Sequence, residues 1–413
     1  MSSIKKLPIG WRKERLERIS DIQTGIAKNQ NNQDETTEFP YLRVANVQDG
    51  YLDLSEIKTI NVQKNKASRY MLDVGDVLLT EGGDFDKLGR GAVWDGQIAN
   101  CVHQNHIFAV RVHRTQLLPS FLSAQTGSTY GKRYFLSCSK QSTNLASINS
   151  SQLKAFPVLF PPLPEQKAIA DLHSIWDEAI EKTERLIQSK EKLFKQLLWE
   201  LIAEPQNTRK DKEWKKVMLG EVCKIAYKEK LSSVGNHFLL TVKLHCLGIG
   251  RNDRMIPKLT ERGRPYFQHN TGDFLIGRQN FHNGGFGIVS PGLDGGITSN
   301  AISCLLVNES KLLRAFLLYQ LSNSNYYKKV GHIMDGTGQK ELSDKQILKL
   351  QIILPSIEEQ QQIAEALSVA QYEIDLLKQL ADKYKTQKRG LMQKLLTGEW
   401  RVKLEIVNQY MES

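Results

Sequence analysis

The sequence predicts an α+β protein that contains two copies of a mixed domain, each followed by a long helix. Three observations predict it. Five landmarks recur in the same order in the two halves of the 413-residue chain, short apolar segments bounded by Gly, Asn or Asp precede each helix, and each helix carries a heptad pattern. The predicted architecture is therefore two pseudo-repeated α/β domains separated by two long antiparallel helices that form a coiled coil.

The internal repeat comes first, because missing a repeat leads to the wrong fold. Segment 10–19 resembles 213–222, with Trp11 matching Trp214, and segment 74–79 resembles 271–276, with Gly-Asp in both. Further matches are Asn105 with Asn300, Phe121, Leu122 and Gln125 with Phe316, Leu317 and Gln320, and segment 160–170 with 354–364. The last pair shares Pro-x-x-x-Glu-Gln-x-x-Ile-Ala. Two unrelated domains do not explain this signature, so we infer a duplication.

Each copy begins with a mixed part. Residues 74–80, 99–112 and 301–307 are predicted strands, since they are short, apolar and bounded by Gly, Asn or Asp. Asp95-Gly96 and Asp294-Gly295 predict turns between strands. Residues 116–125 and 311–322 are predicted short helices.

Each copy ends in a predicted long helix. Pro161, Pro162 and Pro164 exclude helix before them, and a helical pattern starts directly afterwards. Residues on the predicted seam recur in alternating steps of three and four. In the first copy they are Ile169, Leu172, Trp176, Ala179, Thr183, Leu186, Lys190, Leu193 and Leu197. In the second copy they are Ile363, Leu367, Ala370, Ile374, Leu377, Ala381, Tyr384, Lys388, Leu391 and Leu395. We expect the two helices to pack on each other, with the larger apolar residues forming the interface.

These patterns predict four segments. The first mixed domain spans 1–158 and its helix 159–204. The second mixed domain spans 205–352, and its helix with the C-terminal tail spans 353–413.

Composition excludes several classes of protein. No apolar run approaches the roughly 20 residues that cross a bilayer, and residues 1–10 lack the apolar core of a signal peptide, so we expect a cytoplasmic location. The five cysteines are widely spaced and contain no Cys-x-x-Cys pair, which argues against a disulfide framework and a cysteine zinc site.

The formal net charge is +11 and lies off the predicted helices. Residues 162–204 contain nine acidic and six basic residues, and residues 356–400 contain seven and six, so the remainder of the chain carries +15. This distribution is expected if the mixed domains touch phosphates, although a solvated basic face remains an alternative.

Polar loops in both halves carry the donors and acceptors that pair with phosphate, guanine and adenine. The candidate DNA-binding residues of the first half are Arg43, Asn46, Gln48, Lys87, Arg90, His103, Gln104, Asn105, Lys140 and Asn144. Those of the second half are Arg251, Arg254, Arg264, Arg278, Gln279, Asn280, His282, Gln339 and Lys340. Such residues also form ordinary surface turns.

Motifs for catalysis are missing. The sequence has no Gly-x-Gly-x-x-Gly, no Walker A motif and no Asn-Pro-Pro or Asp-Pro-Pro. Glu56-Ile57-Lys58 matches only the last piece of a metal-nuclease motif, and His103-x-x-His106 has no second ligand pair, so a polar loop is the better interpretation. We therefore expect no catalytic residue, no metal and no cofactor in this chain.

The ordered set of motifs resembles type I restriction-modification specificity subunits. The resemblance rests on the duplication, both Pro-x-x-x-Glu-Gln helix starts, the Trp11 and Trp214 openings, both Gly-Asp segments and the stretch Tyr41 to Asp53. It implies two target-recognition domains, each reading one half of a split, asymmetric DNA site. It also implies that the two helices form an antiparallel coiled coil that sets the distance between the halves, that two methyltransferase subunits dock, and that restriction subunits can join. S-adenosylmethionine, ATP and magnesium would belong to those partners. The second half lacks a clear equivalent of residues 41–53.

Helices of about 30 residues would span about 45 Å, on the order of 13 base pairs. The sequence thus predicts half-sites centred roughly one helical turn apart on the duplex. Two alternatives remain: an enzyme that acts alone on DNA, and a coiled-coil adaptor that never touches DNA.

Overall fold

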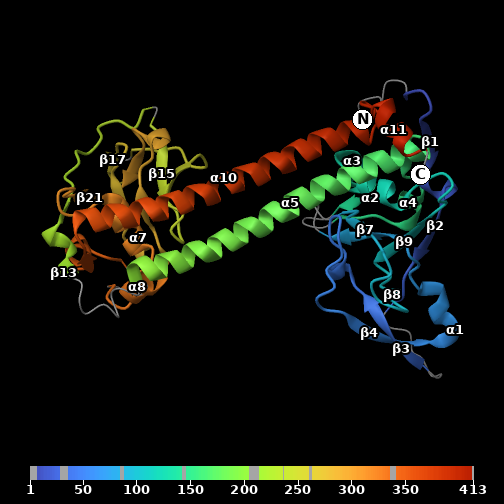
Figure 1. Cartoon of the computed structure of the whole chain (residues 1–413), viewed down its shortest axis with the longest axis horizontal. Helices are drawn as coiled ribbons and strands as arrows, with labels where there is room; N and C mark the ends of the chain where they lie inside the picture. The colour runs from blue at the N-terminus through green and yellow to red at the C-terminus, as the bar shows by residue number, and fades with distance from the viewer. Residues whose placement is uncertain are drawn as a thin grey trace. The chain divides into compact units, whose positions relative to one another are not determined.

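The computed structural model describes residues 7–27, 36–83, 88–141, 146–203, 214–235, 237–259, 263–334 and 341–411. It contains two compact units (Figure 1): unit 1 is Met1–Glu184 with Leu380–Ser413, and unit 2 is Arg185–Gln379. The long helices α5 (Leu163–Leu198) and α10 (Ile357–Leu395) each contribute one part to each unit. No described helix is long and apolar enough to cross a membrane.

Unit 1 contains two main sheets. An antiparallel sheet has the order β2 (Ser20–Thr24), β9 (Ile107–Val112), β5 (Val77–Thr80), β7 (Gly91–Val93). A second sheet has the order β4 (Lys58–Gln63), β3 (Thr36–Leu42), β8 (Val102–His103), in which β3 and β8 are parallel. In smaller sheets, β1 (Arg12–Arg15) pairs with β12 (Pro157–Phe160), and β11 (Ala146–Ser147) lies between β10 (Lys140–Gln141) and β6 (Gly82–Gly83). The short helices are α1 (Lys64–Ala67), α2 (Pro119–Gly127), α3 (Thr129–Cys138), α4 (Ser150–Lys154) and α11 (Leu404–Gln409).

Unit 2 repeats the two main sheets of unit 1, with a fourth strand in the second sheet. Its antiparallel sheet has the order β14 (Cys223–Ile225), β21 (Ile302–Val307), β18 (Phe274–Gly277), β19 (Phe286–Ile288). Its second sheet has the order β16 (Ile249–Asn252), β15 (Leu239–Val242), β20 (Ile297–Ser299), β17 (Tyr266–Gln268), again with one parallel pair, β15 and β20. β13 (Lys215–Met218) pairs with β22 (Gln351–Leu354). The short helices of unit 2 occur in the same order along the chain as those of unit 1, and they are α7 (Arg314–Leu321), α8 (Ser324–Val330) and α9 (Asp344–Leu348). The inferred duplication is confirmed.

The predicted elements exist with shifted bounds. The helix predicted at 116–125 is α2, which starts at Pro119, because proline is favoured in the first turn of a helix. The strand predicted at 99–112 is two strands, β8 and β9, separated by a turn at 104–106. The strand predicted at 74–80 begins only at Val77, since Gly75 has a φ of +96°, which an extended strand does not accommodate.

Each unit has its own hydrophobic core, and both long helices contribute to each core. In unit 1, Ile169 and Met392 pack with the sheet residues Val77 and Phe108. In unit 2, Ile363 and Leu367 pack with Phe274 and Phe316.

A buried glutamine fixes the start of each long helix. Gln166 accepts a hydrogen bond from the Leu118 amide (2.9 Å) and donates to the carbonyls of Gln116 and Pro161 (both 2.8 Å). Gln360 repeats all three bonds in unit 2: it accepts from the Leu313 amide (2.9 Å) and donates to the carbonyls of residues 311 (2.9 Å) and 355 (3.0 Å). Both side chains are fully buried. The Glu-Gln signature therefore orients each helix on its domain.

The preceding glutamates have different partners in the two units. Glu165 is buried and binds the Arg401 guanidinium through both carboxylate oxygens, at 3.1 and 2.6 Å. Glu359 instead accepts a hydrogen bond from the Trp214 indole at 2.9 Å. Because Arg401 also donates to the carbonyl of Ile9, the C-terminal tail holds the N-terminal segment against the helix start.

The predicted seam of α10 is on a buried side of the helix, and the predicted seam of α5 needs a correction. Of the α10 interface residues, Ile363, Leu367 and Ile374 are buried, and Leu377 and Leu391 are half-buried. On α5, Ile169 is buried, and Leu172 and Trp176 are half-buried. Leu186 and Leu193, however, are 44% and 54% exposed.

The sequence places two apolar residues in succession at each corrected position, so the heptad pattern allowed either one to face inward. The side that is buried carries Ile187 and Phe194 instead of Leu186 and Leu193. Phe194 packs edge-on against Tyr319, with ring centroids 6.3 Å apart. This contact with the unit 2 core explains why the seam lies one residue later.

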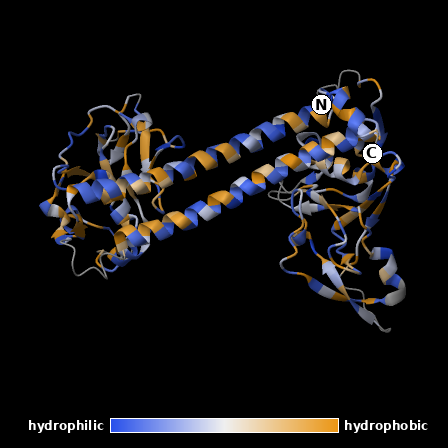
Figure 2. Ribbon diagram, viewed as in Figure 1, coloured by the Kyte–Doolittle hydropathy of each residue, from blue (hydrophilic) through white to orange (hydrophobic). Residues whose placement is uncertain are grey.

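Contacts join the helices within each unit. In unit 1, Trp176 packs on Tyr384 at a centroid distance of 5.7 Å, and Glu184 pairs with Lys385 at 2.6 Å. In unit 2, Lys190 pairs with Glu373 at 2.7 Å. Figure 2 shows hydrophilic and hydrophobic residues alternating along both helices.

Candidate nucleic-acid interface

Asn46 serves the structure of a loop in unit 1. It ends the short helical turn Val44–Asn46 that follows β3, and its side chain is buried. Its amide oxygen accepts from the Arg43 amide at 2.9 Å, and its amide nitrogen donates to the carbonyls of Asp53 (2.8 Å) and Glu56 (3.0 Å). Because these bonds use the amide at both ends, Asn46 holds the loop and is not available to read a base.

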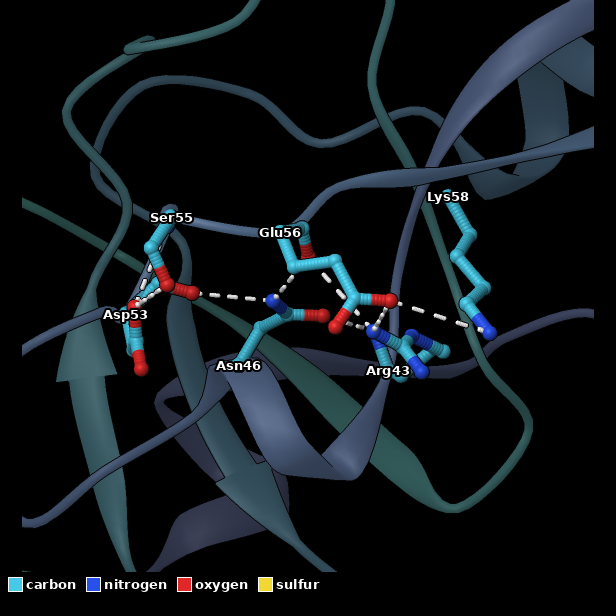
Figure 3. A network of polar contacts seen from close by, with 6 residues as sticks. All are labelled: Arg43, Asn46, Asp53, Ser55, Glu56 and Lys58. Carbon is cyan, nitrogen blue, oxygen red and sulfur yellow. Dashed lines mark hydrogen bonds and ion pairs between the residues drawn. The ribbon is translucent and has the colours of Figure 1, made fainter.

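Arg43 belongs to the same network (Figure 3), and its side chain is 21% exposed. Its guanidinium is 3.4 Å from the carboxylate of Glu56, which Lys58 also approaches at 3.7 Å. Two cations thus share one carboxylate, which leaves a net positive charge beside β4. Glu56-Ile57-Lys58 therefore forms ion pairs with the surrounding loop.

Two candidate loops of unit 1 meet at Gln48 and Arg90. The Arg90 guanidinium donates to the Gln48 amide oxygen at 2.6 Å, and the Gln48 amide nitrogen donates to the carbonyl of Ala45 at 2.7 Å. Both side chains are half-buried. The pair presents a pre-oriented guanidinium, the group that pairs with phosphate or guanine.

His103 is a core residue, which corrects its prediction as a DNA contact. Its side chain is fully buried on β8, and Nδ1 is 3.1 Å from the carbonyl of Tyr70. Burial lowers the pKa of His103 to about 4, so the imidazole is neutral at physiological pH. The neighbouring Gln104 accepts from the Val44 amide at 3.3 Å, and Asn105 is half-buried beside His106. Lys140 is exposed on β10, whereas Lys87 and Asn144 lie outside the described residues.

Unit 2 places arginines on and after β16. Arg251 lies over the ring of Phe238, 4.7 Å from its centroid, and pairs with Asp253 at 2.6 Å. Arg254 and Arg264 are exposed. Stacking on an aromatic ring fixes the guanidinium plane, which favours directional contacts over a diffuse charge.

The segment after β18 supplies a second group in unit 2. Arg278 pairs with Glu341 at 2.6 Å, so much of its charge is neutralised. Gln279 and His282 are half-buried, and Asn280 is exposed on a tight turn closed by Gly284, whose φ is +71°. Gln339 and Lys340 lie outside the described residues.

The two Gly-Asp segments are structural. Asp76 accepts from the Arg111 guanidinium through both oxygens at 2.9 Å, and this hydrogen bonding raises the pKa of Arg111. Asp273 instead pairs with Lys228 at 2.7 Å. Burial raises the pKa of Asp273, but the Lys228 ammonium and the hydrogen bond from the Asn270 amide help to hold that pKa well below its usual value. The two equivalent aspartates therefore pair with different cations.

Sequence reasoning missed three features. Lys58 joins the Arg43 network only because β4 pairs with β3. Arg401 reaches Glu165 from 236 residues away, and no local pattern signals such a contact. The grouping of His269, Asp273 and Cys304 was also missed, because they come from separate parts of the sheet.

Comparisons with known proteins agree with this architecture. A sequence model described as the type I restriction modification DNA specificity domain matches residues 8–190 and again 211–385. The putative type I restriction enzyme MjaX specificity subunit of Methanocaldococcus jannaschii is 24% identical, over 97% of this chain and 96% of its own length.

Two solved structures share the fold. The type I restriction-modification system S subunit from M. genitalium has a TM-score of 0.57 at 14% identity, covering 96% of this chain and 99% of its own. A chain from a study of complex assembly and conformational transition of the type I R-M system has a TM-score of 0.60 at 19% identity, covering 96% and 100%. Since the sequence model matches once in each copy of the repeat, the chain belongs to the type I restriction modification DNA specificity family.

Proposed function

We propose that this chain is the DNA sequence-specificity subunit of a type I restriction-modification complex. The observation that carries the proposal is the pair of specificity-domain matches, one in each copy. The charge distribution supports it, because the +15 excess lies outside the two helical segments. The chain binds a split, asymmetric site, and each mixed domain reads one half.

The reading groups differ between the copies. In the first domain, Arg90, oriented by Gln48, and the cations Arg43 and Lys58 supply donors for phosphate and base edges. In the second domain, the stacked Arg251 and exposed Arg264 do so. Different groups in equivalent domains lead to different half-sites, and hence an asymmetric site.

The helices α5 and α10 serve as an antiparallel coiled-coil spacer between domains 1–158 and 205–352. Ion pairs support this role: Asp177 with Lys388 within unit 1, and Glu191 with Lys378 within unit 2. Removing seven residues from each helix, 181–187 and 375–381, preserves the helical phase and shortens the spacer by about 10 Å. The preferred gap between half-sites should then shrink by about three base pairs, while both half-sites stay the same. An unchanged gap would contradict the spacer role.

Methyltransferase subunits dock on the helices through an apolar stripe. In unit 2, five helix residues are 44–64% exposed: Leu186, Leu193, Val369, Tyr372 and Leu376. All but Tyr372 precede a buried or half-buried seam residue by one position, so they lie about 100° from the seam on each helix. In an antiparallel pair this places both stripes on one face, which fits an amphipathic partner helix.

The docking proposal has a matched test. Leu193→Asp should abolish co-purification with the methyltransferase subunit, because it puts a charge into the apolar stripe. Gln188→Asp, at an exposed position of the same helix, should retain the partner. Equal retention in both variants would exclude this face as the docking surface.

The chain supplies no catalytic group in this proposal: S-adenosylmethionine, ATP and magnesium belong to the methyltransferase and restriction subunits. A DNA-binding assay tests the function. It compares how the chain, together with its methyltransferase partner, binds duplexes that contain the site methylated in the host and duplexes of scrambled sequence. Site-specific binding that weakens steeply with salt is expected. Binding to the partner without any binding to DNA would instead indicate the adaptor alternative.

A further inference from the structure

Three side chains with metal-binding chemistry meet in unit 2. His269 follows β17, Asp273 precedes β18, and Cys304 lies on β21. Their ligand atoms all lie within 4.8 Å of one another. His269 and Cys304 are buried at 1% and 5% exposure, and the Asp273 side chain is 22% exposed.

The His269 ring is oriented in the way that a metal-binding imidazole is. Its Nε2 lies 2.8 Å from the hydroxyl of Thr298, which can accept the N–H. Nδ1 is then left as a lone pair that lies 3.4 Å from a carboxylate oxygen of Asp273. It has no hydrogen-bond partner among the described residues. Histidine ligands commonly donate their second ring nitrogen to such an outer group, so a cation beside Nδ1 would satisfy both acceptors.

We propose that His269, Asp273 and Cys304 bind a zinc ion that ties β17, β18 and β21 together. Zinc prefers thiolate, imidazole and carboxylate ligands, and its bond lengths set ligand separations of about 3.3–3.8 Å in a tetrahedral site. The 3.4 Å separation between His269 and Asp273 fits this geometry. As the zinc–sulfur bond forms, the Cys304 thiol releases its proton to solvent. Water fills the fourth position.

Lys228 competes with the ion. Its ammonium is 2.7 Å from Asp273, and its side chain is 23% exposed, so it can move into solvent when zinc arrives. Zinc then takes over the role of neutralising the carboxylate, which Arg111 performs for Asp76 in unit 1. Removal of the lysine should therefore strengthen zinc binding.

The repeat provides an internal control. Cys304 pairs with Leu275 across the sheet, as Ala109 pairs with Leu78 in unit 1. The first copy thus has no thiol at this position, and only unit 2 has the full ligand set. The equivalent strand folds with alanine there, so Cys304→Ala is a substitution that the sheet should accept.

Cobalt(II) and zinc titration of the full-length, chelator-treated chain tests the proposal. We expect one ion per chain with a sulfur-to-cobalt charge-transfer band. Cys304→Ala should lose the band and bind zinc at least tenfold more weakly, whereas Lys228→Met should bind more tightly. Cys223→Ala, which removes another buried thiol, should behave as the original chain, and circular dichroism reports the fold of each variant. A missing band, a band that survives in Cys304→Ala, or weaker binding in Lys228→Met would overturn the proposal.

Discussion

Replacing Gln166 with leucine should selectively destabilise unit 1. The side chain is fully buried and makes three hydrogen bonds of 2.8–2.9 Å to backbone groups of residues 116, 118 and 161. Leucine has a similar volume, so the substitution removes the bonds without opening a large cavity.

The size of the effect follows from the groups left behind. One backbone N–H and two carbonyls lose their partner, and each buried unsatisfied group costs roughly 1–3 kcal/mol. A loss of roughly 3–9 kcal/mol is expected for three such groups, which is a large share of the 5–15 kcal/mol typical of a domain. Gln360 makes the equivalent three bonds, so Gln360→Leu should cost unit 2 a similar amount.

Hydrogen–deuterium exchange read by mass spectrometry can follow both units in the same chain. Gln166→Leu should raise exchange in the core peptides of unit 1 and spare those of unit 2, and Gln360→Leu should do the reverse. Gln188→Leu, at an exposed position of α5, should change stability by less than about 0.5 kcal/mol. A loss under about 1 kcal/mol for Gln166→Leu would refute the anchoring role of the signature.

Three further changes have defined outcomes. Burial lowers the pKa of His103 from 6.5 to about 4, so its contribution to stability is complete above pH 6.5 and is lost as pH falls toward 4. Unit 1 should lose about 2 kcal/mol between pH 7 and 5 in urea unfolding, and His103→Leu should remove that part of the slope. Arg401→Gln leaves the buried Glu165 without its cation and should lower unit 1 stability by roughly 2 kcal/mol in thermal unfolding. Arg264→Gln should reduce the salt dependence of DNA binding by about one phosphate contact.

Matched controls accompany these changes. His106→Gln alters a half-exposed histidine and should keep the part of the pH slope that comes from the buried His103. Lys403→Gln, an exposed tail residue, should leave unit 1 stability unchanged. Lys378→Gln removes a cation of the long helix that pairs with Glu191, and it should leave the salt dependence of DNA binding unchanged. If Lys378→Gln and Arg264→Gln reduced that dependence equally, the effect of Arg264 would not come from a local phosphate contact.

Features that depend on sequence periodicity or repetition could be predicted. The duplication and the Glu-Gln helix starts were visible, because the same hydrogen bonds require the same residues in both copies. The position of the α5 seam could not be predicted, since Leu186 and Ile187 are both apolar and only the tertiary contacts decide between them. His103 looked like part of a polar loop, yet β8 carries it into the core.

The sequence pattern also could not predict contacts between segments that are far apart in the chain. Nothing near Arg401 indicates that it binds Glu165, and Gln48 meets Arg90 only after the two loops fold together. The sequence could therefore predict which loops and which types of residue are candidates for base contacts. Which of these side chains contact one another could be learned only from the structure.

Domain exchange tests whether each copy of the repeat reads its own half of the DNA site. Residues 1–155 would be replaced by the matching segment of another family member, and the methylated positions in the host genome would be mapped with the chain's own methyltransferase partner. We expect one half of the methylated site to change, while the other half and the gap between the halves remain the same. A site that changes in both halves, or in neither, would contradict the claim that each copy reads its own half.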